Sequence, residues 1–191
     1  VEMIDDIITY DKTLFVYLNN LGSESFDFIW IILSNKLFNI FLYLGATILF
    51  FRNNNFKSTG MLVLLILIMI LFTDQTTNLF KDGFSRLRPC HDPFVYDISR
   101  LVKESCGGLY GFFSAHASNS FSLAIFFIGI FKKTYRYLTP VFLTIAFLIG
   151  YSRIYLGVHY PLDVISGSIY GVFTGYIFHI LWKRFAVFFK N

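Results

Sequence analysis

The run MLVLLILIMILF, from residue 61 to residue 72, decides the fold, because none of its twelve side chains is polar. A helix needs roughly 20 predominantly apolar residues to cross a bilayer. The flanking sequence extends this run to a predicted helix over residues 56–80, which is long enough. The sequence therefore predicts a transmembrane helix at this position.

The composition of the whole chain supports a membrane protein. Of 191 residues, 55% are hydrophobic and 20% aromatic, and 15% are charged, against about 25% charged residues in a soluble domain. This composition excludes a disordered chain, a nucleic-acid-binding tail and an ordinary water-soluble enzyme. We expect one all-α domain over residues 1–191, a polytopic transmembrane helix bundle in a lipid bilayer, with no nucleic-acid partner.

Four more apolar segments give about five predicted spans in total. The first is interrupted by Ser34, Asn35 and Lys36, which predict a kink or break. The last carries small residues at the spacing of close helix contacts; they can pack within one chain or between chains, so the oligomeric state does not follow. The predicted spans are residues 26–51, 56–80, 118–131, 138–151 and 164–182, and the small residues are Ser166, Gly167, Ser168, Gly171 and Gly175.

The segment before the spans, residues 1–22, has a different pattern. Its apolar residues recur at helical spacing, and most of its charged residues fall elsewhere on the helix. Two interpretations are open: an amphipathic helix on the membrane surface, or a helix packed on the loops of the bundle. The apolar residues are Ile4, Ile7, Ile8, Leu14, Phe15, Leu18 and Leu21.

The basic residues predict the orientation in the membrane. Eight of the sixteen lie in three connections on one side of the predicted bundle, and these connections carry no acid. By the positive-inside rule this side is cytoplasmic, so the connections 81–113 and 152–161 face the periplasm or exterior. The eight residues are Arg52, Lys57, Lys132, Lys133, Arg136, Lys183, Arg184 and Lys190.

Both cysteines, Cys90 and Cys106, lie in the exterior connection 81–113. A disulfide between them would persist in an oxidising compartment and would stabilise the loop by roughly 3 kcal/mol. Two unpaired thiols are the alternative. A zinc site made of these cysteines with His91 and His116 has no familiar ligand spacing, so we expect no metal.

Three cations at the exterior ends of the predicted spans point to an anionic ligand. Lys81 and Arg88 are seven residues apart, about two helical turns, and would point the same way if the helix persists to Pro89. Arg153 closes another span. Buried cations need a partner, and arginine binds phosphate through paired N–H groups. Ser114 is a predicted N-cap, whose helix N-terminus would add an anion site.

Other charged and titratable residues are given less specific roles. Arg86, Arg100 and Lys103 are expected to be interfacial anchors that face lipid headgroups. His91 and His179 are expected to be structural. Asp74 lies inside a predicted span, where an acid is a functional candidate; it either holds Lys81 or a loop arginine in place, or makes a hydrogen bond inside the bundle.

Two histidines and one acid suggest the chemistry. His159 and Asp163 are four residues apart, so a carboxylate bonded to one ring nitrogen would leave the other free to attack or to accept a proton. His116, from another helix, would then protonate the leaving oxygen. No carboxylate cluster suggests a catalytic magnesium site.

Three motifs resemble, in order and spacing, the signature of the type 2 phosphatidic acid phosphatase superfamily. They are KDGFSRLRP at 81–89, FSAH at 113–116, and Ser152-Arg153 followed by His159 and Asp163. The resemblance covers residues 81–163. It implies an integral-membrane lipid phosphatase that needs no metal and no cofactor.

The resemblance also implies residue roles. His159 is the implied nucleophile that becomes phosphohistidine, Asp163 orients it, and His116 protonates the leaving group. The implied phosphate-binding set is Lys81, Arg88, Ser114, Arg153 and the backbone N–H of Ala115. The family usually has Pro-Ser-Gly-His in the second motif, whereas this chain has Phe113 and Ala115, and alanine cannot adopt a glycine-only backbone conformation.

The composition of the exterior loop resembles that of bacterial members, which dephosphorylate undecaprenyl pyrophosphate, phosphatidylglycerophosphate or lipid A. We therefore expect a membrane lipid phosphate as substrate, at a multi-pass site facing the periplasm or exterior of a bacterial inner (cytoplasmic) membrane. The headgroup does not follow from the motifs. Two alternatives are a phosphotransferase, which passes the phosphoryl group from His159 to another lipid, and a non-catalytic phospholipid carrier or channel.

Overall fold

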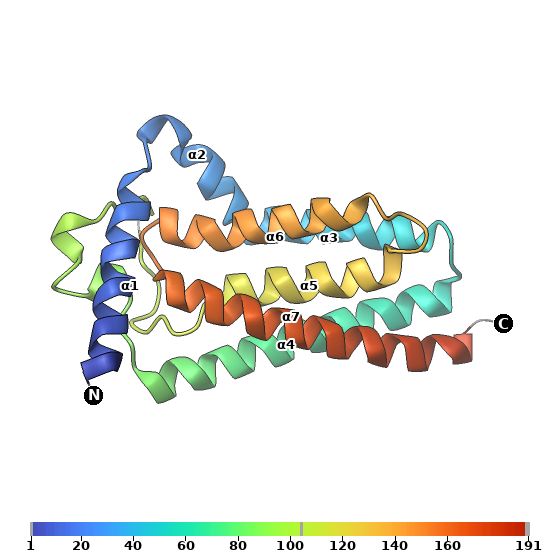
Figure 1. Ribbon diagram of the computed structural model, residues 1–191. Coiled ribbons are helices and arrows are strands. Elements are labelled where there is room, and N and C mark those ends of the chain that lie inside the picture. The colour runs from blue at the N-terminus through green and yellow to red at the C-terminus, as the bar shows by residue number, and fades with distance from the viewer. Residues whose placement is uncertain (1, 104, 190–191) are drawn as a thin grey trace.

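A computed structural model of the protein describes residues 2–103 and 105–189. Helices dominate it, and the long ones run side by side as a bundle (Figure 1), which confirms the predicted all-α fold. Within the described residues β-pairing is limited to one isolated bridge, between Leu87 and Tyr110. The helices are α1 (Glu2–Asn20), α2 (Glu24–Leu33), α3 (Lys36–Phe51), α4 (Phe56–Phe84), α5 (Ala115–Phe131), α6 (Leu138–Tyr155) and α7 (Pro161–Ala186), with short 3-10 turns at Pro89–His91, Tyr96–Ile98 and Val187–Phe189.

Three helices, α4, α6 and α7, are each long and apolar enough to cross a membrane. The pair α2 and α3 makes a fourth candidate span, bent by 52° at its break. The predicted break is therefore confirmed; there the Asn35 side chain accepts a hydrogen bond from the backbone N–H of Leu37, which caps α3. Helix α5 has 17 residues and is shorter than α4, α6 and α7, so the count of five spans stays a prediction.

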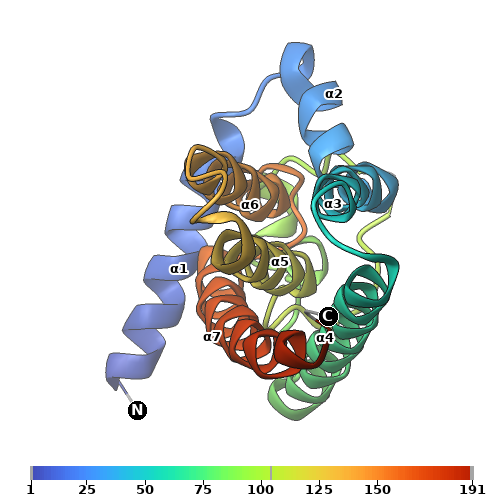
Figure 2. The same ribbon diagram turned by 90° about the vertical axis from the view of Figure 1, so that its right-hand side faces the viewer.

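Helix α5 lies at the centre of the bundle, with α3, α4, α6 and α7 around it (Figure 2). Its closest neighbour is α7, because glycines on α7 face serines on α5 at matching intervals of four residues. A Cβ atom at Gly167 would lie 2.6 Å from the carbonyl oxygen of Ser114, and Cβ atoms at Gly171 and Gly175 would clash with the carbonyl oxygens of Ser118 and Ser122. The small-residue stripe predicted on the last span therefore packs within the monomer.

An aromatic cluster fills the bundle between α3, α5 and α6. Phe127 stacks on Tyr43 from α3 and on Phe142 from α6, with ring centroids 5.8 Å apart in both pairs, and Phe131 stacks on Phe142 at 6.3 Å. All four rings are buried. Many large apolar side chains on the outer surface are exposed, for example Leu64, Phe147 and Phe173, as a surrounding bilayer requires.

Helix α1 crosses the end of the bundle that carries the long loop 85–114 (Figure 1). Asp11, Phe15 and Asn19, spaced four apart, are its buried residues. The Asn19 side chain donates to the carbonyl oxygens of Arg100, Ile154 and Tyr155 and accepts from the N–H of Arg100. One face of α1 is thus packed on the bundle, which is the second of the two interpretations.

The other part of α1 keeps its apolar side chains exposed. Met3, Ile4 and Ile7 are at least half exposed, and the helix lies across the bundle axis (Figure 1). A helix in this direction runs parallel to the plane of a membrane that the bundle crosses. The exposed residues therefore suit contact with lipid headgroups and acyl chains at the surface.

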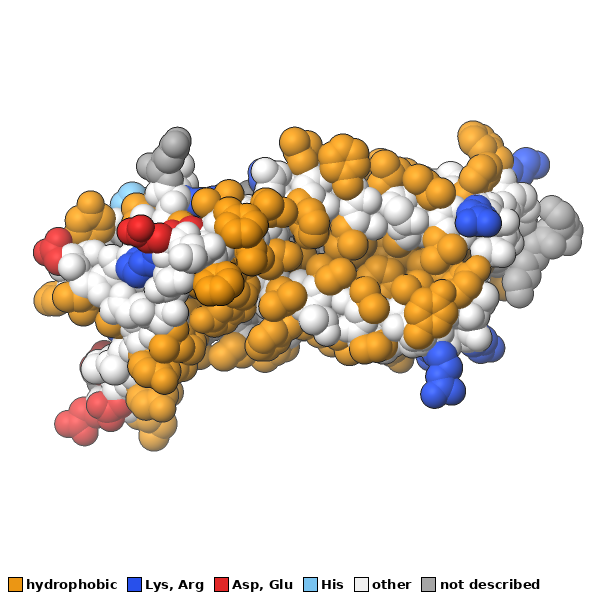
Figure 3. Space-filling view, turned by 90° about the horizontal axis from the view of Figure 1, so that it is seen from above, with side chains coloured by type: hydrophobic (Ala, Val, Ile, Leu, Met, Phe, Trp, Pro, Cys, Tyr) orange, Lys and Arg blue, Asp and Glu red, His pale blue; other side chains and the backbone are white. Residues whose placement is uncertain are grey.

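The charges separate between the two ends of the molecule. Figure 3 shows lysine and arginine side chains without acidic ones at the end that carries the α3–α4 and α5–α6 connections, and acidic side chains together with some basic ones at the opposite end. Seven of the eight residues used for the orientation are exposed, and Lys190 lies outside the described residues. The loop 85–114 and the connection between α6 and α7 are at the acidic end.

We expect Gly171→Ala to destabilise the protein by about 1–3 kcal/mol, because a methyl group has no room against the Ser118 carbonyl oxygen. Gly45→Ala on α3 is the matched control, since a Cβ there meets nothing within 4 Å and alanine favours a helix. Thermal unfolding in detergent should show a lower Tm for Gly171→Ala only. Equal Tm values for the two variants would contradict the close α5–α7 contact.

Candidate active site

A cavity of about 980 Å³ opens between α3, α4 and α5 and reaches the connection between α6 and α7. It brings together residues from all three sequence motifs, although they lie up to 78 positions apart in the chain. Among the predicted site residues, those that line the cavity are Lys81, Arg88, Ala115, His116, Arg153, His159 and Asp74. Ser114 and Asp163 lie behind this lining and are fully buried.

The pair His159 and Asp163 is built at the start of α7. Pro161 is the first residue of the helix and Asp163 the third, and Pro161 does not disturb the pair, because proline is favoured at a first helical position. The Asp163 Oδ2 atom accepts from the backbone N–H of Tyr160 at 3.0 Å and lies 3.4 Å from Nδ1 of His159. The contact with Asp163 is made by Nδ1, so Nε2 is the ring nitrogen of His159 that does not face this carboxylate.

The surroundings of His159 favour the neutral ring. Burial and the nearby cations Arg88, Arg153 and Lys81 lower the pKa of His159 well below its ordinary value. A histidine with a lowered pKa keeps an unprotonated nitrogen at pH 7 and in mild acid. This is the form that a nucleophile needs.

Arg88 reaches the cavity by a route that differs from the predicted one. Helix α4 ends at Phe84, and Ser85 takes a left-handed conformation with φ of 49°. The helix therefore does not persist to Pro89, which was the condition for helical spacing to align Lys81 and Arg88. The chain reverses there, and Arg88 pairs with the segment 109–110 through its backbone N–H and its Nε. Lys81 and Arg88 still face one cavity, but the loop rather than the helical repeat brings them together.

Arg153 lies almost fully buried near the end of α6. Its Nη1 donates to the hydroxyl of Ser34, at the break between α2 and α3. Its Nε is buried without a partner among the described residues. A buried guanidinium with an unused donor fits a site for a phosphate oxygen.

The second motif forms the N-terminus of α5. Ser114 is the N-cap, as predicted, and its backbone N–H donates to the carbonyl oxygen of Asp163 at 3.0 Å. This bond ties the start of α5 to the start of α7. Ala115 begins the helix and lines the cavity, so its N–H belongs to the helix N-terminus, where an anion binds favourably.

A family model described as the PAP2 superfamily matches residues 60–186. The chain belongs to the PAP2 superfamily. This is the superfamily that the three motifs resemble, so the resemblance is confirmed.

Two relatives cover nearly the whole chain. It is 34% identical to the lipid A 4'-phosphatase of Bacteroides thetaiotaomicron, over 94% of this chain and 80% of that protein. It is 32% identical to the lipid A 4'-phosphatase of Porphyromonas gingivalis, over 93% and 73%. Both relatives carry phosphatase names, and the chain is a PAP2-type phosphatase.

Two solved structures share the fold. The transmembrane PAP2 type phosphatidylglycerolphosphate phosphatase from Bacillus subtilis superposes with a TM-score of 0.70 at 21% identity, over 97% of this chain and 89% of that one. Aquifex aeolicus LpxE superposes with a TM-score of 0.65 at 23% identity, over 87% and 92%. The helix arrangement is therefore that of PAP2 membrane phosphatases.

Several charged residues have roles other than the expected ones in this PAP2 fold. The interfacial-anchor interpretation is wrong for Arg86, which pairs with Asp11 and Asp163, and for Arg100, which pairs with Asp27. It is also wrong for Lys103, which lines the cavity; burial and the cations Arg153 and Arg88 lower the pKa of Lys103. Arg86 and Arg100 thus pair with carboxylates inside the protein, and only Lys103 of the three lines the cavity.

Asp74 holds neither Lys81 nor a loop arginine through any hydrogen bond or ion pair among the described contacts. It accepts a hydrogen bond from the amide of Asn119 at 2.8 Å, and the Asn119 oxygen accepts from Thr73 at 2.5 Å. Of the two predicted roles, the hydrogen bond inside the bundle is the observed one. Asn119 is one helical turn beyond His116, so this bond ties α4 to the N-terminal part of α5.

Gly111 is a site residue that the sequence motifs did not indicate. A Cβ atom there would lie 3.0 Å from Asp163 Oδ2 and 3.2 Å from Cγ of Arg88. Glycine therefore lets the loop backbone approach the His159–Asp163 pair. Lys36 is another such residue. The sequence places it in the break before α3, and in the structure it lines the cavity.

Cys90 and Cys106 form a disulfide in the structure. His91 lies within 4.8 Å of both sulfur atoms, but a disulfide leaves no thiolate for a metal. The Cys106 carbonyl oxygen accepts from Nη1 of Arg88 at 3.0 Å. The disulfide thus fixes one of the carbonyl groups that orient Arg88.

We expect a variant with both cysteines replaced by serine to raise KM several-fold with a smaller change in kcat, because Arg88 loses a fixed acceptor. The loss of the cross-link should also lower the free energy of unfolding by about 3 kcal/mol. Kinetics and Tm of the detergent-solubilised protein measure both effects, and wild-type protein treated with reductant should show the same changes. A KM that stays constant in both preparations would contradict this role of the disulfide.

Proposed function

We propose that this PAP2 phosphatase hydrolyses the phosphomonoester of a glycolipid of the lipid A type, without a metal, through a phosphohistidine on His159. The observation that carries the proposal is the single cavity in which two histidines and several cations meet at one end and apolar helix faces continue at the other. The identity to two lipid A 4'-phosphatases over more than nine-tenths of the chain supports the headgroup class.

The proposed reaction has two steps. In the first, Nε2 of His159 attacks phosphorus, the bond from phosphorus to the lipid oxygen breaks, and His116 gives its proton to that oxygen. In the second, His116 takes a proton from water, the water oxygen attacks phosphorus, and the bond from phosphorus to Nε2 of His159 breaks, which releases inorganic phosphate. Lys81, Arg88 and Arg153 neutralise the phosphoryl oxygens, which is the main electrostatic contribution in such transfers.

The lining of the cavity changes in polarity along α4, as an amphiphilic substrate requires. Lys81 is followed along the helix by Asn78, Gln75 and Asp74, and then by apolar residues down to Val63. At 1.5 Å per residue this row is about 27 Å long. The cations suit a phosphate, the polar section suits the hydroxyl and amide groups of a sugar lipid, and the apolar section suits an acyl chain. The apolar residues are Leu71, Ile70, Leu67, Ile66 and Val63.

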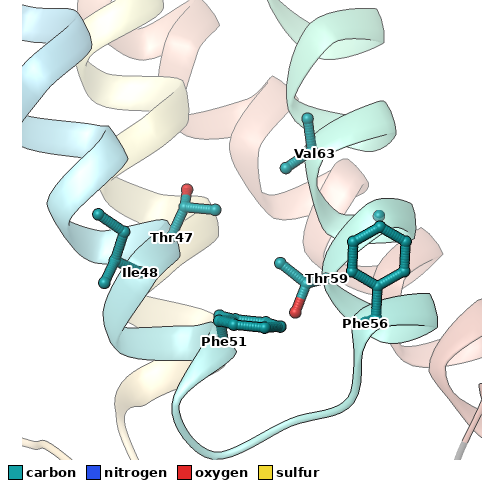
Figure 4. A pocket seen from close by; sticks show the side chains of 7 residues that line it. Thr47, Ile48, Phe51, Phe56, Thr59 and Val63 are labelled. Atoms are coloured by element: carbon teal, nitrogen blue, oxygen red, sulfur yellow. The ribbon is translucent and has the colours of Figure 1, made fainter.

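A second hollow, of about 420 Å³, continues the cavity between α3 and α4 (Figure 4). It shares Thr47 and Val63 with the main cavity. Figure 4 shows the two helices separated above their connection, with Phe51 and Phe56 near its base. An acyl chain can therefore leave the cavity sideways between α3 and α4, toward the bilayer.

Hydrolysis of a lipid pyrophosphate is the second candidate. The observation that favours it is the number of cations, since Lys36 and Lys103 line the cavity in addition to the three cations of the motifs. Five cations exceed what one phosphate needs, and a second phosphate would use the surplus. The polar section around Asp74 and Gln75 has no matching group in an isoprenoid chain, so the glycolipid stays the first choice.

The proposed site faces the periplasm of a bacterial inner membrane. The disulfide lies at the same end as the site, and such bonds persist in oxidising compartments. The exposed basic connections lie at the opposite end (Figure 3), which the positive-inside rule assigns to the cytoplasm. Both arguments give the same orientation.

We expect His159→Ala to abolish phosphate release in the presence of EDTA, because the phosphohistidine cannot form. The assay uses lipid A, phosphatidylglycerophosphate, phosphatidic acid and undecaprenyl pyrophosphate, and lipid A should be the fastest substrate. Activity that survives in His159→Ala would exclude His159 as the nucleophile. Undecaprenyl pyrophosphate as the fastest substrate would favour hydrolysis of a lipid pyrophosphate. Binding without any phosphate release by the wild type would favour a carrier, and transfer to a second added lipid would favour a phosphotransferase.

We expect Leu67→Trp to lower kcat/KM at least tenfold for lipid phosphates, because the indole would fill the apolar section of the cavity. Hydrolysis of a small aryl phosphate, which has no acyl chain, should change less than twofold. Leu64→Trp is the control, since Leu64 is exposed on α4 like Leu67 but lies outside the cavity lining. Equal losses on both substrates, or equal losses in both variants, would contradict acyl-chain binding between α3 and α4.

A further inference from the structure

A chain of charged side chains connects helix α1 to the proposed nucleophile. Arg86 donates from Nη1 to Oδ1 of Asp163 at 2.8 Å and from Nη2 to Oδ2 of Asp11 at 2.5 Å. The other oxygen of Asp163, Oδ2, faces His159. A carboxylate, a guanidinium and a second carboxylate thus follow one another up to the imidazole ring, in the order Asp11, Arg86, Asp163 and His159.

Both carboxylates depend on this one guanidinium. Asp163 is fully buried and Asp11 is 3% exposed, and among the described residues Arg86 is the only Lys or Arg that makes an ion pair with either. Burial raises the pKa of Asp11, and the hydrogen bond and charge of Arg86 oppose that rise. Removal of Arg86 would leave two buried acids with no cation between them, which is strongly unfavourable.

The position of Arg86 is fixed from several sides. Its guanidinium lies over the ring of Tyr160, 4.4 Å from the centroid, and the Tyr160 ring packs against the buried Phe15 of α1 at 5.3 Å. The remaining oxygen of Asp11, Oδ1, accepts from the backbone N–H of Leu162 in the first turn of α7. Helix α1 therefore contacts both Arg86 and the turn that carries Asp163.

We propose that Arg86 is a positioning residue for the His159–Asp163 pair, and that Asp11 of helix α1 holds Arg86 in place. The inference rests on the proposed function, because it assigns these residues to the hydrolysis at His159. Arg86 does not line the cavity, so it acts through Asp163 and not on the phosphate. Helix α1, which lies outside the three motifs, is by this inference part of the catalytic apparatus.

The test compares Arg86→Gln, Arg86→Lys, Asp11→Asn and the double variant Asp11→Asn/Arg86→Gln, with kcat, KM and Tm measured on lipid phosphate in detergent. Asn keeps an oxygen for the Leu162 N–H, so Asp11→Asn removes mainly the charge. Arg100→Gln is the matched control, because it breaks the Arg100–Asp27 pair at the same end of the bundle, which has no contact with Asp163.

We expect Arg86→Gln to lower kcat about 100-fold and Asp11→Asn about tenfold, with KM within threefold of wild type. Arg86→Lys should recover part of kcat, since an ammonium can meet one carboxylate but does not bridge both. The double variant should be no slower than Arg86→Gln alone, because Asp11 acts through Arg86. Arg100→Gln should keep kcat within twofold.

Three results would overturn the inference: wild-type kcat in Arg86→Gln, additive losses in the double variant, or a loss of kcat in Arg100→Gln as large as in Arg86→Gln at equal Tm. Loss of Tm and kcat together in every variant, without recovery in Arg86→Lys, would also overturn it, because the role would then be structural. Activity that persists in His159→Ala refutes the proposed function itself. The two failures are therefore distinguishable.

Discussion

The close contact of α5 with α7 is the constraint on which the rest of the structure depends. Gly167, Gly171 and Gly175 let the α7 backbone approach the carbonyl oxygens of Ser114, Ser118 and Ser122. In a bilayer no hydrophobic effect drives helices together, so such short contacts and van der Waals packing supply much of the free energy of helix association. The first contact of the series is at Ser114, which also donates its N–H to Asp163.

This contact sets the relative positions of the two histidines. His116 is in the first turn of α5, and the His159–Asp163 pair is at the start of α7, so the spacing of the two helix ends is the spacing of the proposed acid and nucleophile. The other cations are then added from α4, from the loop 85–114 and from α6. A shift of α5 along α7 by one turn would move His116 by about 5.4 Å and separate it from the pair.

Much of this arrangement follows from the sequence. The apolar runs predict the helices, and the three motifs predict Lys81, Arg88, His116, Arg153 and His159, which line one cavity. The motifs predict these site residues because phosphate chemistry needs particular residue types, and the apolar runs show that these residues lie at helix ends. The break at Ser34 was also predictable, although its hydrogen bond to Arg153 was not.

The loop contacts were not predictable, because they depend on how the chain folds between helices. Ser85 ends α4 before Pro89, so helical spacing could not place Arg88. Arg86 looked like a headgroup anchor since it lies between motif positions, and its partners are 75 and 77 residues away. No local sequence pattern predicts an ion pair across such a separation. The contact of Gly111 with the His159–Asp163 pair was not predictable for the same reason.

The contacts of helix α1 explain what a helix that lies across the bundle axis contributes to this membrane phosphatase. Its face with Asp11, Phe15 and Asn19 covers the loops, where backbone groups would otherwise lack partners. Asn19 satisfies three carbonyl oxygens and one N–H, and Asp11 places a negative charge against Arg86. The same helix keeps Ile4 and Ile7 exposed, so the side chains that suit the membrane surface and the carboxylate that pairs with Arg86 belong to one helix.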